Sequence, residues 1–244
     1  MSLSEMVDTL LPIDLQRSLT DTTYDRLVDA IATDKLPPGM RLNQRDLANQ
    51  LMVSRQPISH ALQRLKATGL AIETGRKGLA VAPVDLVRLK DLYDLRTEIE
   101  GLIAARAAGN MKAGRCNPGD LEEMQRLLVF GAAISVETPV LDCITADVDF
   151  HLCLYRLCGS AVIGEAIAPL WPHFRRSMGS ALSIHTHRKV SWDGHRAIAA
   201  AVLAGNPGAA RKAARDHIEI AGKTALRSLD ELSSPKNTQP SAAQ

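Results

Sequence analysis

The sequence has few of the features that mark membrane, secreted or β-rich proteins. Aromatic residues make up only 3% of its 244 positions, and no run approaches the ~20 consecutive apolar residues that a membrane span needs. Glu5 and Asp8 stand where a secretory signal would carry basic residues. We therefore expect a cytoplasmic protein that does not enter a membrane.

Cysteine is also scarce, and its spacing excludes several kinds of site. The four cysteines form no C-x-x-C pair, and Cys143, Cys153 and Cys158 lie in apolar, helix-like surroundings. A zinc site or a disulfide framework usually shows closer or more regular spacing. We expect all four to be reduced, with these three in a core.

Apolar residues recur every three or four positions along most of the chain, and alternation typical of strands is confined to residues 70–84. The pattern predicts a mostly α protein. Its length favours two domains over one. We expect an amino-terminal arm over residues 1–18, a small first domain over 19–84, an all-α domain over 85–231 and a disordered tail over 232–244.

The small net charge of +2 hides a basic segment in the first domain. Residues 41–78 hold seven Lys or Arg against two acidic residues. An excess of positive charge in one small region favours an anionic partner such as nucleic acid.

The same segment has the outline of a winged helix-turn-helix. A short helix is expected from Asn43 to about Leu51, a second helix capped by Ser54 runs to about Thr68, and a hairpin follows with a basic tip. The leading turns of the second helix would meet base edges in double-stranded DNA. The residues expected at the DNA are Arg45, Ser54, Arg55, Gln56, Ser59, Arg76 and Lys77. A plain helical domain with a solvated basic face is the alternative.

The order of residues resembles a known DNA-binding domain. The run L-P-P-G-M-R-L-N-Q-R-D-L-A-N-Q-L-M-V-S-R-Q-P-I-S-H-A-L-Q-R-L-K-A-T-G-L is similar to the winged helix-turn-helix of the GntR family of bacterial regulators. The resemblance implies that Arg45, Ser54, Arg55, Gln56 and the wing residues contact DNA, and it adds Gly78 to the site. Ser59 stands where the family usually has arginine, so recognition there is expected to differ.

In the second domain, several ionisable side chains fall on apolar helix faces. Asp147 and His151 are four residues apart, so they share one face of a helix, and His195 and His217 lie on the apolar stripes of two later segments. Burying such groups without partners is costly. Each histidine could be satisfied by one hydrogen bond in a core. Alternatively, the four residues could share a divalent metal ion such as Zn²⁺ or Ni²⁺.

The second domain resembles the FCD effector domain of the FadR-like branch of GntR regulators. The similarity rests on L-Y-D-L-R-T-E-I-E-G-L-I-A-A-R-A-A, D-V-D-F-H, G-H-R-A-I-A-A-A-V-L-A-G-N and A-R-D-H-I. It implies a metal held by Asp147, His151, His195 and His217. The asparagine that commonly follows the D-x-x-F-H helix is missing, since the chain reads G-S-A-V there.

Arg96 shares an inward face with Glu100. It could form an internal ion pair with Glu100 or Asp147, or it could bind the carboxylate of an effector.

Together these features predict a ligand-responsive transcription regulator, a repressor, that binds a palindromic operator as a homodimer and responds to a small organic acid. We do not expect an enzyme. Two alternatives are a metal-dependent hydrolase fused to a DNA-binding domain and a metal-free regulator that responds to acyl-CoA.

Overall fold

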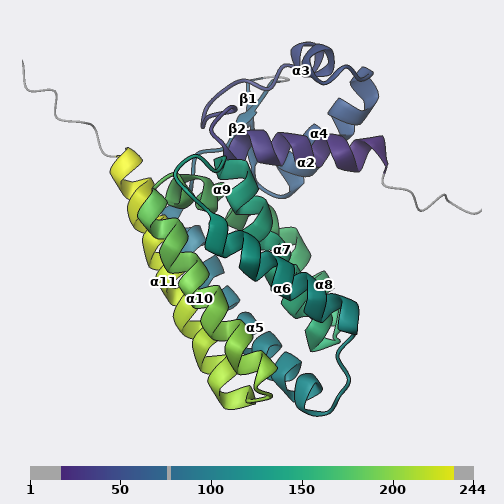
Figure 1. Ribbon diagram of the computed structural model, residues 1–244. Helices are drawn as coiled ribbons and strands as arrows, with labels where there is room; N and C mark the ends of the chain where they lie inside the picture. Colours follow the sequence, from purple (N-terminus) through teal and green to yellow (C-terminus); the bar gives the residue numbers. More distant parts are fainter. Residues whose placement is uncertain (1–17, 76–77, 234–244) are drawn as a thin grey trace, which may run out of the picture.

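The computed structural model describes residues 18–75 and 78–233 as a helical protein with one two-stranded sheet (Figure 1). Its buried apolar residues form two clusters, one within residues 24–81 and the other almost wholly from residue 89 onward. The expected fold class, a winged helix-turn-helix followed by an all-α bundle, is confirmed. Among the described residues, no helix combines the length and hydropathy required to traverse a membrane.

The first domain consists of three helices and a hairpin. Its elements are α2 (Leu19–Ala32), α3 (Gln44–Leu51), α4 (Arg55–Ala67), β1 (Ala71–Thr74) and β2 (Gly78–Val81). The Asn43 side chain accepts a hydrogen bond from the Arg45 amide and so caps α3, as Asn commonly does. Ser54 precedes α4 as expected, but its hydroxyl makes no capping hydrogen bond. Buried apolar residues of α4 anchor that helix instead.

The strands β1 and β2 pair antiparallel, with Thr74 opposite Gly78, and Arg41 adds one bridge to Ala80. This hairpin is the expected wing. Arg76 and Lys77, which we expect at its tip, lie outside the described residues.

The second domain is a bundle of long helices. Its elements are α5 (Leu86–Lys112), α6 (Pro118–Ala133), α7 (Val140–Cys158), α8 (Ala161–Ile167), the 3-10 turn η1 (Ala168–Leu170), α9 (Trp171–Leu182), α10 (His185–Leu203) and α11 (Pro207–Ser233). The two longest helices, α5 and α11, pack against each other, α10 packs on α11, and α7 packs on α5 (Figure 1). Cys143, Cys153 and Cys158 are buried and unpaired in this bundle, as expected.

One polar stretch of the bundle is more helical than its composition suggests. The stretch 183–192 contains Ser, Thr and several histidines and reads as a loop, yet α10 already begins at His185. Arg188 and Trp192 are buried on its inner face. The Arg188 guanidinium donates to the backbone carbonyls of Leu182, Ser135 and Thr138, which satisfies its charge inside the fold. The last helix, α11, continues to Ser233, two residues beyond the expected end of the all-α domain at residue 231.

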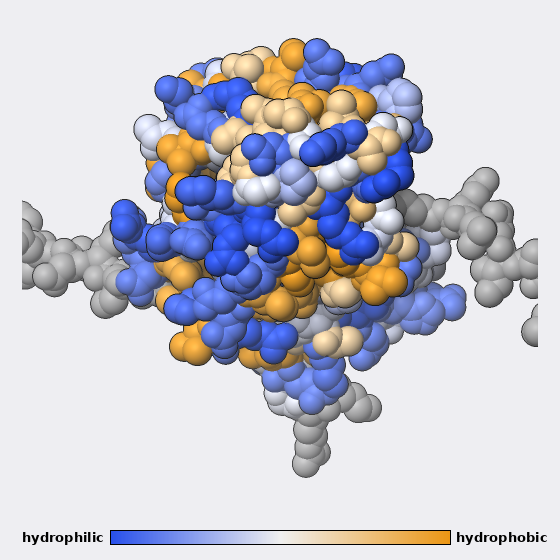
Figure 2. All heavy atoms as spheres, turned by 90° about the horizontal axis from the view of Figure 1, so that it is seen from below, coloured by the Kyte–Doolittle hydropathy of each residue, from blue (hydrophilic) through white to orange (hydrophobic). Residues whose placement is uncertain are grey.

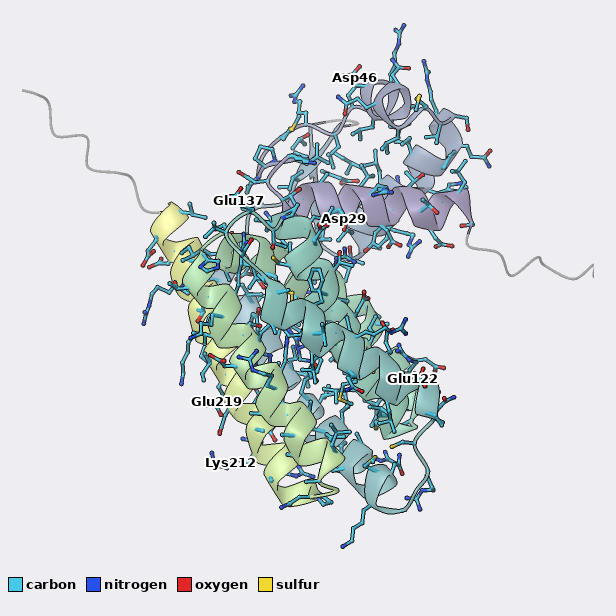
Figure 3. The ribbon with its side chains drawn as sticks, viewed as in Figure 1. Asp29, Asp46, Glu122, Glu137, Lys212 and Glu219 are labelled. Atoms are coloured by element: carbon cyan, nitrogen blue, oxygen red, sulfur yellow. The ribbon has the colours of Figure 1, made fainter. Side chains whose placement is uncertain are left out.

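The two domains touch through α9. His173 Nε2 lies 2.7 Å from the carbonyl oxygen of Thr68, and Arg175 pairs with Asp29 on the side of α2 that faces the bundle (Figure 3). Arg176 Nη2 donates to the carbonyl oxygen of Ala82 over 2.6 Å. These bonds fix the first domain on the end of the bundle.

A glycine permits this close contact between α9 and α2. A Cβ atom at Gly179 would lie only 1.6 Å from the carbonyl oxygen of Ala32. Because that neighbour is backbone, it cannot rotate away as a flexible side chain can.

Seen from below, the surface mixes hydrophilic and hydrophobic residues, with hydrophobic patches reaching the exterior between charged ones (Figure 2). Large exposed apolar side chains on the bundle include Leu95, Leu102, Val129 and Phe130. Exposed apolar area of this kind is common in chains that associate.

Candidate DNA interface and effector pocket

The expected DNA-contacting residues lie on exposed parts of α3 and α4. Arg45, Arg55, Gln56 and Ser54 are exposed, and Ser59 is partly exposed. The α3 helix lies on the side of its domain away from the bundle (Figure 1). This arrangement leaves the helix-turn-helix accessible to a large ligand.

The ion pairs of this domain separate its basic residues into two groups. Arg64 lies 2.5 Å from Asp21, and Lys66 lies 2.5 Å from Glu73. Within residues 18–75 and 78–233, neither Arg45 nor Arg55 forms an ion pair. Arg45 and Arg55 are thus exposed cations of the helix-turn-helix that no carboxylate occupies, and DNA phosphates could take that place.

The four candidate metal ligands converge in the core of the bundle. Asp147 and His151 extend from α7, His195 from α10 and His217 from α11. Asp147 Oδ1 lies 3.7 Å from His151 Nε2, and Asp147 Oδ2 lies 3.6 Å from His195 Nε2. One ring nitrogen from each histidine lies within 4.8 Å of the other two. All four residues are at most 5% exposed.

Several buried polar atoms of this cluster have no hydrogen-bond partner among the described residues. They include Asp147 Oδ1, His151 Nε2 and His195 Nε2. Most buried polar groups in folded proteins do have a partner. A core histidine satisfied by one hydrogen bond is therefore a poor description of His151 and His195. Atoms that face one another at these distances without hydrogen bonds are a donor set that fits a cation.

Burial also sets the protonation state of the imidazoles. Removal from water lowers the pKa of His151 to about 3 and holds the pKa values of His195 and His217 well below the ordinary value. The rings are neutral at physiological pH, which is the form that coordinates metal ions.

Beside the histidines lies a buried ion pair. Arg96 Nε donates to Glu100 Oε1 over 3.2 Å, and the Tyr155 hydroxyl donates to the same oxygen over 2.8 Å. Glu100 Oε2 lies 3.1 Å from His151 Nδ1. The ion pair between Arg96 and Glu100 is one of the two roles expected for Arg96. Its guanidinium also stacks 4.7 Å above the Trp171 ring, and its Nη2 has no partner among the described residues.

The formal charges of this buried group do not balance. Desolvation opposes the charge of Arg96, but Glu100 and its other neighbours raise the arginine pKa overall, so the guanidinium stays cationic. One cation faces the two carboxylates of Glu100 and Asp147, and the histidines are neutral. A formal net charge of minus one on largely buried side chains is unfavourable. A divalent cation would turn it into a net positive charge of one.

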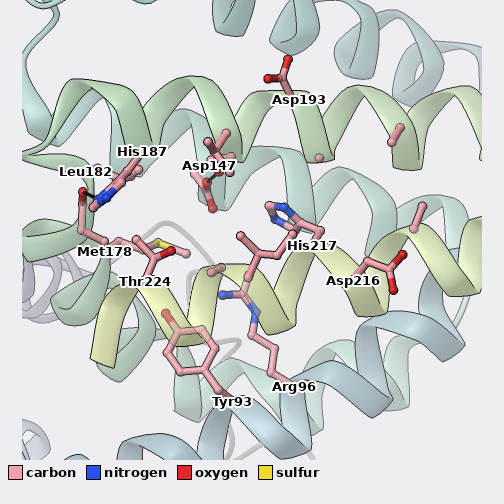
Figure 4. A pocket seen from close by; sticks show the side chains of 18 of the residues that line it. Tyr93, Arg96, Asp147, Met178, Leu182, His187, Asp193, Asp216, His217 and Thr224 are labelled. Atoms are coloured by element: carbon pink, nitrogen blue, oxygen red, sulfur yellow. Dashed lines mark hydrogen bonds between the residues drawn. The ribbon is translucent and has the colours of Figure 1, made fainter. Parts of the chain in front are cut away.

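A cavity of about 460 Å³ opens onto this cluster. It lies between α5, α9, α10 and α11, with Arg96, Asp147 and His217 in its wall (Figure 4). In Figure 4 the Arg96 side chain extends from α5 into the pocket, toward the side on which His217 lies. The volume falls within the range of sites that bind small molecules.

Sequence reasoning misses the contact of Glu100 with His151 and the roles of two further residues, Ser191 and Gly194. Glu100 touches His151 as well as Arg96, and Ser191 donates to Asp147 Oδ2 over 2.8 Å. A Cβ atom at Gly194 would lie 2.4 Å from His217 Nδ1, so a larger residue would displace that ring. Ser191 and Gly194 come just before His195 in the sequence, which indicates that they lie near the candidate ligands. Their contacts with Asp147 and His217 depend on how α10 packs against α7 and α11.

Comparisons with known proteins agree with both domains. The family model described as "Bacterial regulatory proteins, gntR family" matches residues 19–81, and the model described as "FCD domain" matches residues 91–220. The chain belongs to the GntR family and carries an FCD domain. The resemblance seen in the sequence is therefore confirmed for both halves.

The relatives are regulators. A protein of Escherichia coli named "Putative L-lactate dehydrogenase operon regulatory protein" is 27% identical over 246 residues, which cover 90% of each chain. An HTH-type regulator of Agrobacterium vitis is 31% identical over 85 residues, and the match spans 35% of this GntR chain and half of that protein. The solved structure of E. coli McbR/YncC has the same fold, with a TM-score of 0.73, 22% identity and coverage of 89% of this chain and 99% of that one. These matches identify a transcription regulator rather than an enzyme, as the sequence suggested.

Proposed function

We propose that this GntR regulator is a homodimeric repressor that binds a palindromic operator and responds to a small organic acid at a metal centre in its FCD domain. One observation carries the proposal. A buried cluster with a net negative charge and unpaired donor atoms lies at the wall of a cavity, beside an arginine nitrogen without a partner.

The ion would be held by Asp147, His151, His195 and His217. Three imidazoles and one carboxylate suit Zn²⁺ or Ni²⁺. When bound, the ion would supply positive charge to which a carboxylate oxygen can coordinate. The protein supplies the rest: Ser191 orients Asp147, and Glu100 lies against the far side of His151.

The effector's carboxylate would be recognised by Arg96. Its Nη2 is buried and has no partner within residues 18–75 and 78–233, and the residue lines the cavity. A guanidinium binds carboxylates with directional, charge-assisted hydrogen bonds.

At the DNA, Arg45 and Arg55 would supply positive charge without first breaking an internal ion pair. Arg55 lies in the first turn of α4, where a bidentate contact to guanine is sterically possible. Two copies related by a two-fold axis would read two half-sites about one helical turn apart. The exposed apolar side chains of α5 and α6 support association of two bundles. Because bacterial DNA lies in the cytoplasm, we place the working regulator there.

Helix α9 would carry the signal between the two sites. Met178 and Leu182 line the cavity, while the neighbouring Arg176 binds the backbone of Ala82 just after the wing. The Tyr93 hydroxyl, also at the cavity, lies 2.9 Å from Ser177 Oγ. A ligand that shifts α9 would favour one arrangement of the DNA-binding domain over the other.

The two alternatives receive less support. A metal-dependent hydrolase needs a general base free to act beside the ion, but Glu100 is already engaged by Arg96 and Tyr155. If the protein were a metal-free regulator that responds to acyl-CoA, nothing would neutralise the buried negative charge or bind the imidazole nitrogens that have no partner among the described residues.

Metal content tests the proposal directly. We expect the purified protein to hold about one Zn²⁺ or Ni²⁺ per chain by elemental analysis. We also expect chelation to lower its melting temperature and to abolish stabilisation by carboxylates. His195→Ala should lose the ion, whereas His185→Ala, an exposed histidine on the same helix, should keep it. Full metal content in the His195 variant would refute the four-residue site.

A further inference from the structure

The cavity walls carry more information about the effector than the metal cluster does. Away from Arg96, Asp147 and His217, most of the lining is apolar and comes from α9, α10 and α11. The apolar residues of this wall include Met178, Leu182, Val190, Ala197, Ala213 and Ile220. A ligand that fills the cavity must place most of its surface against them.

Most polar side chains of the same walls have a partner within the protein, either in an exposed ion pair or in a hydrogen bond inside the bundle. Lys212 pairs with Asp216, and Asp193 pairs with Arg196. The hydroxyls of Tyr93 and Ser191 bind Ser177 and Asp147.

Two further polar groups complete this inventory. His187 Nδ1 lies 2.9 Å from the carbonyl oxygen of Ala181, and Thr224 contributes a hydroxyl to the lining. A ligand rich in hydroxyl groups would therefore bury most of them without partners, which costs free energy for each group.

Apolar side chains also reach the mouth of the cavity, beside the exposed Asp193, Lys212 and Asp216. Val190 on α10 and Ile220 on α11 both line it, and they are 47% and 48% exposed. Half-exposed apolar residues on two helices at the opening of a pocket would lose contact with water when a ligand with an apolar body enters.

The cavity volume is also too large for the smallest acids. At roughly 30 Å³ per water molecule in the liquid, it corresponds to on the order of fifteen waters. A two- or three-carbon acid bound at Arg96 would leave most of the apolar wall wet.

We propose that the effector is a monocarboxylate with an apolar body of about five or more carbons, rather than a sugar acid or a two- or three-carbon acid. The inference rests on the proposed function, because the carboxylate must lie at Arg96 and the metal for the body to reach Met178, Leu182 and Ile220.

The test compares ligands that differ in one property at a time. Hexanoate and gluconate are six-carbon monocarboxylates that differ in hydroxyl groups, acetate keeps only the head group, and hexanamide replaces the carboxylate by a neutral amide. Affinities are measured by titration calorimetry on the metal-loaded, full-length protein.

We expect hexanoate to bind more tightly than acetate by on the order of 100-fold, because each buried methylene contributes roughly a fourfold factor. Gluconate should bind no better than acetate, and hexanamide should bind much more weakly than hexanoate. Gluconate or acetate binding as tightly as hexanoate would overturn this inference and leave the proposed carboxylate site standing. Binding of none of the three acids would overturn both.

Variants at the mouth of the cavity test independently where the apolar body of the effector lies. Ile220→Ser should weaken hexanoate binding several-fold without changing acetate binding or metal content, since the side chain is 48% exposed and lies at the mouth rather than at the metal cluster. Leu203→Ser, on α10 and equally exposed at 48% but outside this cavity, is the matched control. Equal effects of the two variants on hexanoate binding would overturn the placement of the apolar body.

Discussion

The buried ion pair beside the histidines offers a sharp test of the electrostatic account. Helix α5 carries two pairs with the same four-residue spacing, Arg96 with Glu100 and Lys90 with Asp94. The first pair has side chains 1% exposed, and those of the second are 62% and 65% exposed. Replacing each cation by Met removes the charge and leaves a shorter, unbranched side chain, and the two pairs differ chiefly in burial.

For Arg96→Met we expect a loss of about 3–5 kcal/mol in the free energy of unfolding, because Glu100 becomes an unpaired charge in a dry interior. This corresponds to a fall in melting temperature on the order of 10 °C for a domain of this size. For Lys90→Met we expect almost no change, since water and salt screen the exposed pair. Urea denaturation followed by circular dichroism measures both.

A double variant separates loss of charge from loss of packing. Arg96→Met combined with Glu100→Leu removes the orphaned carboxylate, so it should be more stable than Arg96→Met alone. Recovery should be partial, because the Tyr155 hydroxyl loses its acceptor. If Arg96→Met is no less stable than Lys90→Met, then Arg96 and Glu100 are not a charged pair shielded from water.

Three further outcomes are expected. Gly194→Ala should lower metal affinity although all four ligands remain, because its Cβ would lie 2.4 Å from His217 Nδ1; unchanged affinity in a metal-competition titration would contradict that packing. Gly179→Ala should separate the domains and weaken the effect of effector on DNA binding, since no side-chain movement relieves a contact with the Ala32 carbonyl; an intact effector response in a gel-shift assay would contradict this. Arg55→Ala should abolish specific binding to an operator selected from random DNA while circular dichroism shows an intact fold, and unchanged affinity would refute its place in recognition.

Features that depend on residues near one another in sequence were predictable. The helix-turn-helix followed from the ordered motif around Asn43 and Ser54, and the contact between Asp147 and His151 followed from their spacing on one helix. The inward position of Arg96 also followed from apolar periodicity, and it is 1% exposed. Local backbone geometry fixes such relations, so they do not need the rest of the fold.

Other features were decided only when the helices packed. Asp147, His195 and His217 lie on three different helices, and their convergence depends on crossing angles that no spacing encodes. The start of α10 at His185 was missed because polar residues there are satisfied by carbonyls from distant segments. The sequence thus determined the two domains, the helix-turn-helix and which polar residues point inward. Tertiary packing alone decided that those residues share one unbalanced charge cluster and that an apolar cavity opens beside it, because both depend on which helix faces meet.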